Sequence, residues 1–316
     1  MSAPRPEWEV EWRTVLDSAE LRRVRSLAEE VARADGVAAF SEPTMLDLRG
    51  AHPGSTPGST HHALVPGPNA DGPEGGLLGY AHVDVSDPAD PVVELAVSPP
   101  RRGGGVGATL AAAVLAAFPG ARVWAHGDHP GAVRLAERLG LRRARELWMM
   151  RRDPSAGPLP TRPLPEGVAI RALRVGVDEP AVVAVNGRAF AWHPEQAGMT
   201  LDDVRVREGE PWFDAEGFLL AWDEASGELL GFHWTKVHER SASVRTPVGE
   251  VYVVGVDPAA QGRGLGSVLT LAGLHHLAGR GLDTVVLYVE GDNAPAVATY
   301  RKLGFERTAI DVSYAR

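Results

Sequence analysis

The spacing of apolar residues predicts a helix near the start of the chain, followed by strands. Leu21, Val24 and Val31 recur at the interval of a helix with one buried face. Short runs rich in valine, leucine and alanine follow at residues 76–85 and 92–97, and their length and composition are typical of strands. The first half of the chain therefore combines helices with a β-sheet.

The second half shows the same progression with a clearer pattern. The elements that it predicts are strands at residues 217–222, 229–238, 249–256 and 284–289, and a helix at residues 265–278. This alternation of strands and helices predicts an α/β (α+β) fold with mixed β-sheets flanked by helices.

Two short sequences occur once in each half. Residues 77–82 read LLGYAH and residues 229–234 read LLGFHW, while residues 93–99 read VELAVSP and residues 251–258 read VYVVGVDP. Each copy then enters a glycine-rich turn and an apolar helix. Such a repeat indicates two copies of one fold.

A proline-rich stretch separates the two copies. Residues 153–165 read DPSAGPLPTRPLP, and proline at this density is incompatible with a helix or a central strand. We therefore expect an N-terminal domain at residues 1–152, an extended linker at 153–165 and a C-terminal domain at 166–316.

Composition narrows the class of protein. The 316 residues are 44% hydrophobic, carry a formal net charge of -9 and include no cysteine, so a disulfide or a cysteine acyl-enzyme is excluded. We find no apolar run long enough for a membrane span and no signal-peptide core, and we expect a cytoplasmic monomer that binds neither membrane nor nucleic acid. The eleven histidines form no His-Glu-x-x-His pattern, and we expect no metal site.

The strongest chemical signal lies at residues 251–267, VYVVGVDPAAQGRGLGS. A strand runs into the sequence Gln261-x-x-Gly264-x-Gly266, which opens a helix. Glycines allow a close backbone approach, and the free N–H groups of a helix start favour an anion such as a pyrophosphate. A glycine-rich turn without a ligand is the alternative, whereas the Rossmann and Walker A patterns are both missing.

This stretch resembles motif A of the GNAT acetyltransferases, Arg/Gln-x-x-Gly-x-Gly/Ala. Residues 287–305, LYVEGDNAPAVATYRKLGF, resemble motif B of the same family, with Asn293 before a helix that carries Tyr300. The resemblance implies two tandem GNAT folds, acetyl-CoA as cosubstrate and direct acetyl transfer to an amine.

The resemblance also implies roles for individual residues. Tyr300 would protonate the departing CoA thiolate and Glu250 would accept a proton from the amine, although packing and solvation are the alternative roles. The pantetheine arm would pair with the strand edge around Gly255, where a β-bulge would offer an oxyanion-stabilising N–H. The implied acetyl-CoA contacts of the C-terminal copy are Val254, Gly255, Val256, Gln261, Gly262, Arg263, Gly264, Leu265, Gly266, Ser267, Asn293, Ala294, Pro295, Ala296, Val297 and Ala298.

The N-terminal copy keeps the first motif but departs from the second. Its corresponding sequence is Arg102-x-x-Gly105-x-Gly107, but Ala136 stands opposite Tyr300 and His129 replaces Asn293. We therefore expect a non-catalytic domain that can still hold CoA. Its implied contacts are Leu95, Ala96, Val97, Arg102, Gly103, Gly104, Gly105, Val106, Gly107 and Ala108.

The acceptor follows from a narrower resemblance. A tandem GNAT chain of this length, with GFHWTKVH at residues 231–238, resembles the enzymes of mycothiol biosynthesis. This implies acetylation of the cysteinyl amine of desacetylmycothiol to give mycothiol and CoA. The acceptor contacts that it implies are Glu42, Glu195, Lys236, Glu250 and Tyr288. Two alternatives stay open: another small amine such as an aminoglycoside, or a degenerate acetyl-CoA-binding regulator.

Overall fold

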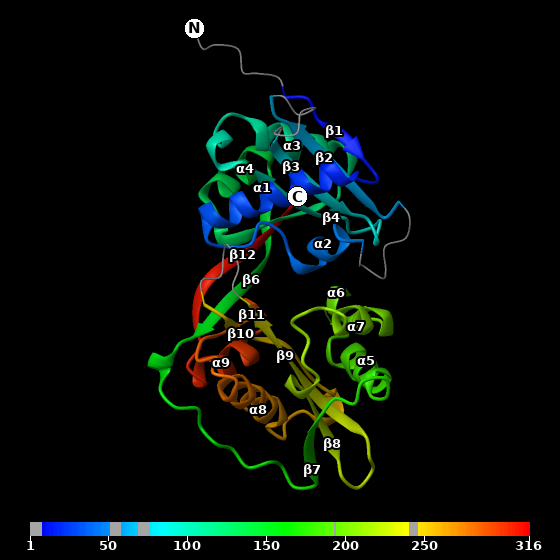
Figure 1. The fold of residues 1–316 in the computed structure, drawn as a ribbon, viewed down its shortest axis with the longest axis vertical. Coiled ribbons are helices and arrows are strands. Elements are labelled where there is room, and N and C mark those ends of the chain that lie inside the picture. Colours follow the sequence, from blue (N-terminus) through cyan, green and yellow to red (C-terminus); the bar gives the residue numbers. More distant parts are fainter. Residues whose placement is uncertain (1–7, 51–57, 69–75, 193, 240–245) are drawn as a thin grey trace. The chain divides into compact units, whose positions relative to one another are not determined.

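The computed structural model describes residues 8–50, 58–68, 76–192, 194–239 and 246–316, which form two compact units (Figure 1). Unit 1 comprises Met1–Leu147 and Ala309–Arg316, and unit 2 comprises Trp148–Thr308. Each unit is an α/β assembly built on its own part of the β-sheet, with its own hydrophobic clusters. The GNAT-like order of elements expected from the repeat is present in both.

The division differs from the predicted boundaries at both ends of unit 2. The first part of β6 (Arg142–Arg152) belongs to unit 1, and its last part belongs to unit 2, where Met150 is fully buried in the core. The last part of β12 (Glu306–Ala315) returns to unit 1 and buries Val312 and Tyr314 there. Periodicity alone does not assign these side chains to one unit or the other, so their burial decides how β6 and β12 divide between the units.

The sheet of unit 1 has the strand order β1-β2-β3-β4-β5-β12-β6. The ladders from β1 to β4 and between β5 and β12 are antiparallel, and β4 pairs with β5 in parallel. The elements that lie wholly in unit 1 are β1 (Glu11–Arg13), α1 (Ser18–Asp35), α2 (Glu42–Asp47), β2 (Thr60–Pro66), β3 (Leu77–Asp84), β4 (Val92–Val97), η1 (Pro99–Arg101), α3 (Val106–Ala117), β5 (Arg122–Ala125), η2 (His126–Asp128) and α4 (Pro130–Leu139).

Alternation along the strands gives this sheet two buried faces. Ala63 and Val65 pack in the cluster that contains α3 and α4, whereas Leu64 packs in the cluster that contains α1. The helix predicted from Leu21 onward is α1. A capping box between Asp17 and Glu20 fixes its start, so the helix begins with its backbone donors satisfied.

The sheet of unit 2 has the strand order β12-β6-β11-β10-β9-β8-β7. Strands β7 to β10 pair antiparallel, and β10 pairs with β11 in parallel. The elements that lie wholly in unit 2 are η3 (Pro154–Ala156), β7 (Val168–Ala172), α5 (Glu179–Ala189), α6 (Pro194–Ala197), α7 (Leu201–Glu208), η4 (Ala215–Gly217), β8 (Phe218–Asp223), β9 (Leu229–His238), β10 (Val248–Val256), η5 (Pro258–Ala260), α8 (Leu265–Gly279), β11 (Val285–Glu290) and α9 (Ala294–Lys302).

Helices cover both faces of the unit 2 sheet (Figure 1). Helices α8 and α9 lie on one face, with Leu274 and Val297 buried in a shared cluster. Helix α5 covers the other face, where Val182 packs with Phe232 and Trp234. Among the described residues, no helix is both long enough and apolar enough to span a bilayer.

Candidate active site

Strands β10 and β11 are paired only over their first residues. The parallel ladder joins residues 249–251 to residues 285–287, whereas β10 continues to Val256 and β11 to Glu290. On its other side, β10 stays paired with β9 as far as Val256. In the described part of the chain, no strand pairs with the β11-facing edge of residues 254–256. An extended ligand could therefore form strand-like hydrogen bonds along this edge.

The prediction of a β-bulge at Gly255 is wrong. Gly255 pairs in register with Phe232, and the irregularity lies between Val251 and Val253, where Tyr252 is the extra residue. Position 255 has a different need for glycine, because a Cβ there would lie 2.7 Å from the Phe232 ring. The bulge therefore lies between the paired start of β10 and its open edge.

A tight turn leads from β10 into α8. Gly262 and Gly264 have φ angles of +81° and +77°, a left-handed conformation that residues with side chains rarely adopt. Gly264 is the N-cap of α8 and has no side chain with which to cap it, which leaves the first N–H groups open to an anion. Gln261 donates weakly to the Val256 carbonyl at 3.4 Å, and Arg263 donates to a backbone carbonyl at 3.2 Å.

Several predicted acetyl-CoA contacts have side chains that point into the core. Leu265 and Val297 are buried in separate hydrophobic clusters, so that only their backbone could reach a ligand. In contrast, Ala294, Pro295 and Ala298 are exposed on α9. The implied contacts therefore include residues that could offer only their backbone to a ligand and residues whose side chains are exposed.

Helix α9 carries the predicted general acid. Asn293 starts the helix, since its side chain accepts the N–H of Ala296 at 3.2 Å. Tyr300 is partly buried and packs edge-on against Phe305, with 5.9 Å between ring centroids. Burial raises the pKa of Tyr300 to about 12, so the phenol is protonated at neutral pH. Tyr300 and Val254 pack against the same hydrophobic cluster.

Charged and aromatic side chains lie around Glu250, the predicted general base on β10. Glu250 lies directly opposite Lys236 in the β9–β10 ladder, and both residues are buried. The Glu250 carboxylate accepts a hydrogen bond from the imidazole of His238. The Lys236 Nζ lies 4.5 Å from the ring centroid of Trp212 and 5.0 Å from that of Tyr252. One carboxylate, one ammonium and two aromatic rings thus meet on the same part of the sheet.

The other predicted acceptor contacts are more widely distributed. Tyr288 is 46% exposed on β11, directly after the last residue that pairs with β10. Glu195 lies on α6, and its side chain is outside the described part of the structure. Glu42 is the first residue of α2 in unit 1. The structure therefore brings Lys236 and Glu250 into direct opposition.

Unit 1 repeats the open edge and the glycine turn. Its parallel ladder joins residues 92–94 to residues 122–124, and β4 continues to Val97. Gly103 and Gly105 have φ angles of +77° and +97°, as in the corresponding turn of unit 2. The backbone geometry that motif A predicted is therefore present twice.

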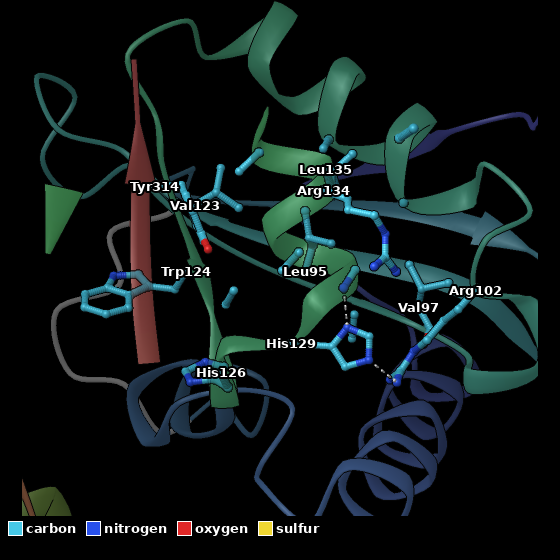
Figure 2. A pocket seen from close by; sticks show the side chains of 18 of the residues that line it. Leu95, Val97, Arg102, Val123, Trp124, His126, His129, Arg134, Leu135 and Tyr314 are labelled. Carbon is cyan, nitrogen blue, oxygen red and sulfur yellow. Dashed lines mark hydrogen bonds between the residues drawn. The ribbon is translucent and has the colours of Figure 1, made fainter. Parts of the chain in front are cut away.

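Arg102 anchors this turn in unit 1. Its Nε donates to the Val97 carbonyl at 3.2 Å, the contact that Gln261 makes with its own strand in unit 2. Both terminal nitrogens donate to Asp35, at 2.6 and 2.9 Å. His129 Nε2 lies 3.3 Å from the same guanidinium (Figure 2). The Arg102 charge is thus already partly neutralised by Asp35.

A pocket of about 400 Å³ opens beside this turn within unit 1 (Figure 2). Most of its lining is apolar and comes from β4, β5, α3 and α4. The labelled side chains that line it in Figure 2 are Leu95, Val97, Arg102, Val123, Trp124, His126, His129, Arg134, Leu135 and Tyr314. The pocket adjoins both the open edge of β4 and the glycine turn, where motif A would hold CoA.

Helix α4 has the capping side chain of motif B but lacks its tyrosine. His129 Nδ1 accepts the N–H of Gly131 at 3.0 Å and so caps α4, as Asn293 caps α9. Ala136 lines the pocket at the position that corresponds to Tyr300. The two helices therefore start in the same way, whereas only α9 carries a tyrosine at this position.

Sequence reasoning missed three residues near these sites. Asp311 and Tyr314 enter unit 1 on β12, and no local pattern connects them with a pocket far away in the sequence. His238 could have been found, because alternation along β9 puts it on the same face as Lys236.

Comparison with known proteins agrees with this geometry. Residues 188–305 match the model of the acetyltransferase (GNAT) family. A protein named mycothiol acetyltransferase from Actinosynnema mirum is 53% identical over 310 residues, which cover 96% of this chain and 98% of that protein. A protein of the same name from Nocardia farcinica is 49% identical over 309 residues, 97% of either chain.

Solved structures resemble the whole chain. A tandem GNAT protein from the clavulanic acid biosynthesis pathway has a TM-score of 0.71 at 19% identity and covers 98% of both chains. A GCN5-related N-acetyltransferase from Sphaerobacter thermophilus has a TM-score of 0.69 at 23% identity, with 97% of this chain and 95% of that chain covered. At these identities the likeness shows the fold alone.

Proposed function

Because the chain belongs to the mycothiol acetyltransferase family of GNAT enzymes, we propose that it acetylates the cysteinyl amine of desacetylmycothiol. The acetyl donor is acetyl-CoA, and the products are mycothiol and CoA. The chain has no cysteine to carry an acyl group, so the proposal is direct transfer from thioester to amine.

The open edge of β10 and the glycine turn that follows it carry this proposal. Hydrogen bonds from the edge at residues 254–256 would align the pantetheine arm, and the turn at Gly262 and Gly264 would hold the pyrophosphate. Both contacts use the backbone, so they hold the cosubstrate in one register. Register matters because the thioester carbon must meet the amine within about 3–3.5 Å.

The reaction requires proton transfers in two directions, away from the acceptor nitrogen and toward the leaving sulfur. The amine nitrogen forms a bond to the thioester carbon, and the carbon–sulfur bond breaks. Glu250 would accept protons from the acceptor nitrogen, and Tyr300 would give its proton to the CoA thiolate and regain one from solvent. Since the ammonium loses two protons and the thiolate gains one, each turnover releases one net proton. The raised pKa of Tyr300 supports this division, because the phenol enters each cycle protonated.

The acceptor would lie against the polar group around Glu250. Lys236 and Tyr288 offer hydrogen bonds to the hydroxyl groups of a sugar and an inositol, and Glu42 and Glu195 are the further contacts that the family resemblance implies. A site whose polar groups bind substrate hydroxyls discriminates against acceptors without those hydroxyls, because its polar groups would then be left without hydrogen-bond partners. This supports a sugar-containing amine as the acceptor.

Unit 1 is proposed to hold CoA or acetyl-CoA without turning it over. Its glycine turn and open strand edge match those of unit 2, which supports binding. Ala136 leaves the pocket without the proton donor that Tyr300 would supply in unit 2, which argues against chemistry there. Unit 2 is accordingly the proposed catalytic unit.

Steady-state turnover with acetyl-CoA and a panel of amines tests the proposed acceptor. Desacetylmycothiol should gain one acetyl group by mass and keep a free thiol, at a rate far above that of an aminoglycoside. Chromatography is the appropriate readout, because the acceptor thiol would obscure a thiol-reactive assay of CoA. A higher kcat/KM for the aminoglycoside would support the alternative enzyme, and no turnover of any amine would support a regulator.

A further inference from the structure

His238 contacts the proposed general base from the neighbouring strand. It is the last residue of β9, and its Nε2 lies within hydrogen-bonding distance of Glu250 Oε2. A carboxylate oxygen can only accept a hydrogen bond, so the Nε2–H of His238 is the donor. The side chain of Glu250 is 8% exposed and that of His238 is 34% exposed. The imidazole thus connects a buried carboxylate with the surface.

The register of the ladder explains why these two side chains meet. Val248 pairs with His238, and Glu250 pairs with Lys236, so Glu250 is the diagonal neighbour of His238. Residues two apart on a strand share a face, and diagonal neighbours are within reach of long side chains. The register of the two strands therefore places the side chains of His238 and Glu250 within reach of each other.

Lys236 is held by a different set of partners on this face. Its ammonium lies over the rings of Trp212 and Tyr252, a favourable cation–π arrangement. The Tyr252 hydroxyl accepts a hydrogen bond from Arg207 Nε at 2.8 Å, which fixes that ring. The aromatic rings thus orient the cation opposite Glu250, while the imidazole contacts the carboxylate itself.

We infer that His238 is a positioning residue for Glu250 in acetyl transfer. By holding Oε2, the imidazole fixes the plane of the carboxylate and leaves Oε1 free to accept the proton of the attacking amine. An unheld carboxylate would rotate about its terminal bond, and loss of alignment at a reacting group lowers the rate steeply. This inference rests on the proposed role of Glu250 as the general base.

A double-mutant cycle on the full-length protein tests the inference. We expect His238→Ala to lower kcat by about 10- to 100-fold while the KM for acetyl-CoA stays unchanged. His238→Gln should recover much of this loss, since its amide can still donate to the carboxylate. In a Glu250→Gln background, His238→Ala should cause little further loss, because the group that it positions is already disabled. His275→Ala removes an exposed imidazole elsewhere in unit 2 and is the matched control.

The possible outcomes separate this inference from the proposed function. Full activity of Glu250→Gln would overturn the role of Glu250 and, with it, that of His238. If Glu250→Gln is impaired but His238→Ala is as active as the unmodified enzyme, only the inference about His238 is overturned. Equal losses from His238→Ala in both backgrounds would indicate a general structural role and would also overturn it. Circular dichroism of each variant verifies folding.

Discussion

The Asp311 carboxylate forms a hydrogen bond of 3.0 Å with the imidazole of His126 and accepts one of 2.8 Å from the backbone N–H of Gly127. Asp311 is 185 and 184 residues away from these partners along the chain. Gly127 and Asp128 have positive φ angles, so the loop before α4 adopts a conformation that needs external support. Asp311 supplies that support from β12. The C-terminal strand therefore shapes the loop that borders the pocket of unit 1 (Figure 2).

Asp311→Ala should destabilise unit 1. The substitution removes a hydrogen bond to the partly buried imidazolium of His126 and leaves it facing Glu94, and a hydrogen bond to a charged group contributes about 1.5–3 kcal/mol. Urea unfolding, followed by a probe in unit 1, measures the loss. Glu11→Ala, which breaks a solvent-accessible ion pair with Arg13 in the same unit, is the control and should change stability by less than about 1 kcal/mol. Equal effects of the two variants would contradict the role of Asp311.

The stability of unit 1 should fall at alkaline pH. Burial alone would lower the pKa of His126, but hydrogen bonds and charges from Asp311 and Glu94 outweigh it and raise the pKa from 6.5 to about 10. The stabilisation from the folded-state imidazolium is therefore complete below pH 6.5 and is lost as the pH rises from 6.5 to 10. The free energy of unfolding, measured across this range, should decrease, and His126→Gln should abolish this component. An unchanged slope in that variant would show that another group titrates.

Tyr300→Phe should lower kcat by about 100-fold or more, because it removes the proton donor for the CoA thiolate. The ring contact with Phe305 remains, so folding and the KM for acetyl-CoA should be preserved. With a Tyr300 pKa of about 12, the unmodified enzyme should show no loss of rate from this group below pH 10. Normal turnover by the Phe variant would exclude Tyr300 as the general acid.

Gly266→Leu should abolish turnover without unfolding unit 2. Gly266 has ordinary space around it, since the nearest side-chain atom, on Val256, would lie 3.7 Å from an added Cβ. A leucine would extend from there into the region proposed for the pyrophosphate. Gly279→Leu is the matched control and should retain activity, because Gly279 is the last residue of the same helix and an added Cβ there would have no neighbour within 4 Å. Acetyl-CoA binding by calorimetry distinguishes a blocked site from misfolding.

Gly107→Leu tests the division between the units. The corresponding position in unit 1 has a Val97 methyl 3.3 Å from an added Cβ, so a leucine would narrow the pocket. We expect the variant to lose any second CoA site and the stabilisation that a bound ligand gives to the folded state. Its turnover of desacetylmycothiol should persist. If Gly107→Leu is inactive while Gly266→Leu is active, the catalytic unit has been assigned to the wrong half.

Local sequence determined much of the candidate site. Gln261, Gly262 and Gly264 could be interpreted directly, because positive φ angles and a bare helix start are properties of a few consecutive residues. The capping role of Asn293 is equally local, and the resemblance of the same stretch to motif B is what indicated Tyr300. A run rich in valine likewise indicated β10 without reference to any other strand.

Tertiary structure alone decided what depends on distant partners. The bulge lies at Tyr252 because β10 must keep register with β9, and Gly255 is needed because the Phe232 ring fills the space beside it. Asp311 reaches His126 only because β12 leaves unit 2 and completes the sheet of unit 1. A short-range pattern reports the conformations that one segment can adopt. Which segments become neighbours depends on burying the apolar faces of the whole chain at once, a condition that no single stretch of sequence carries.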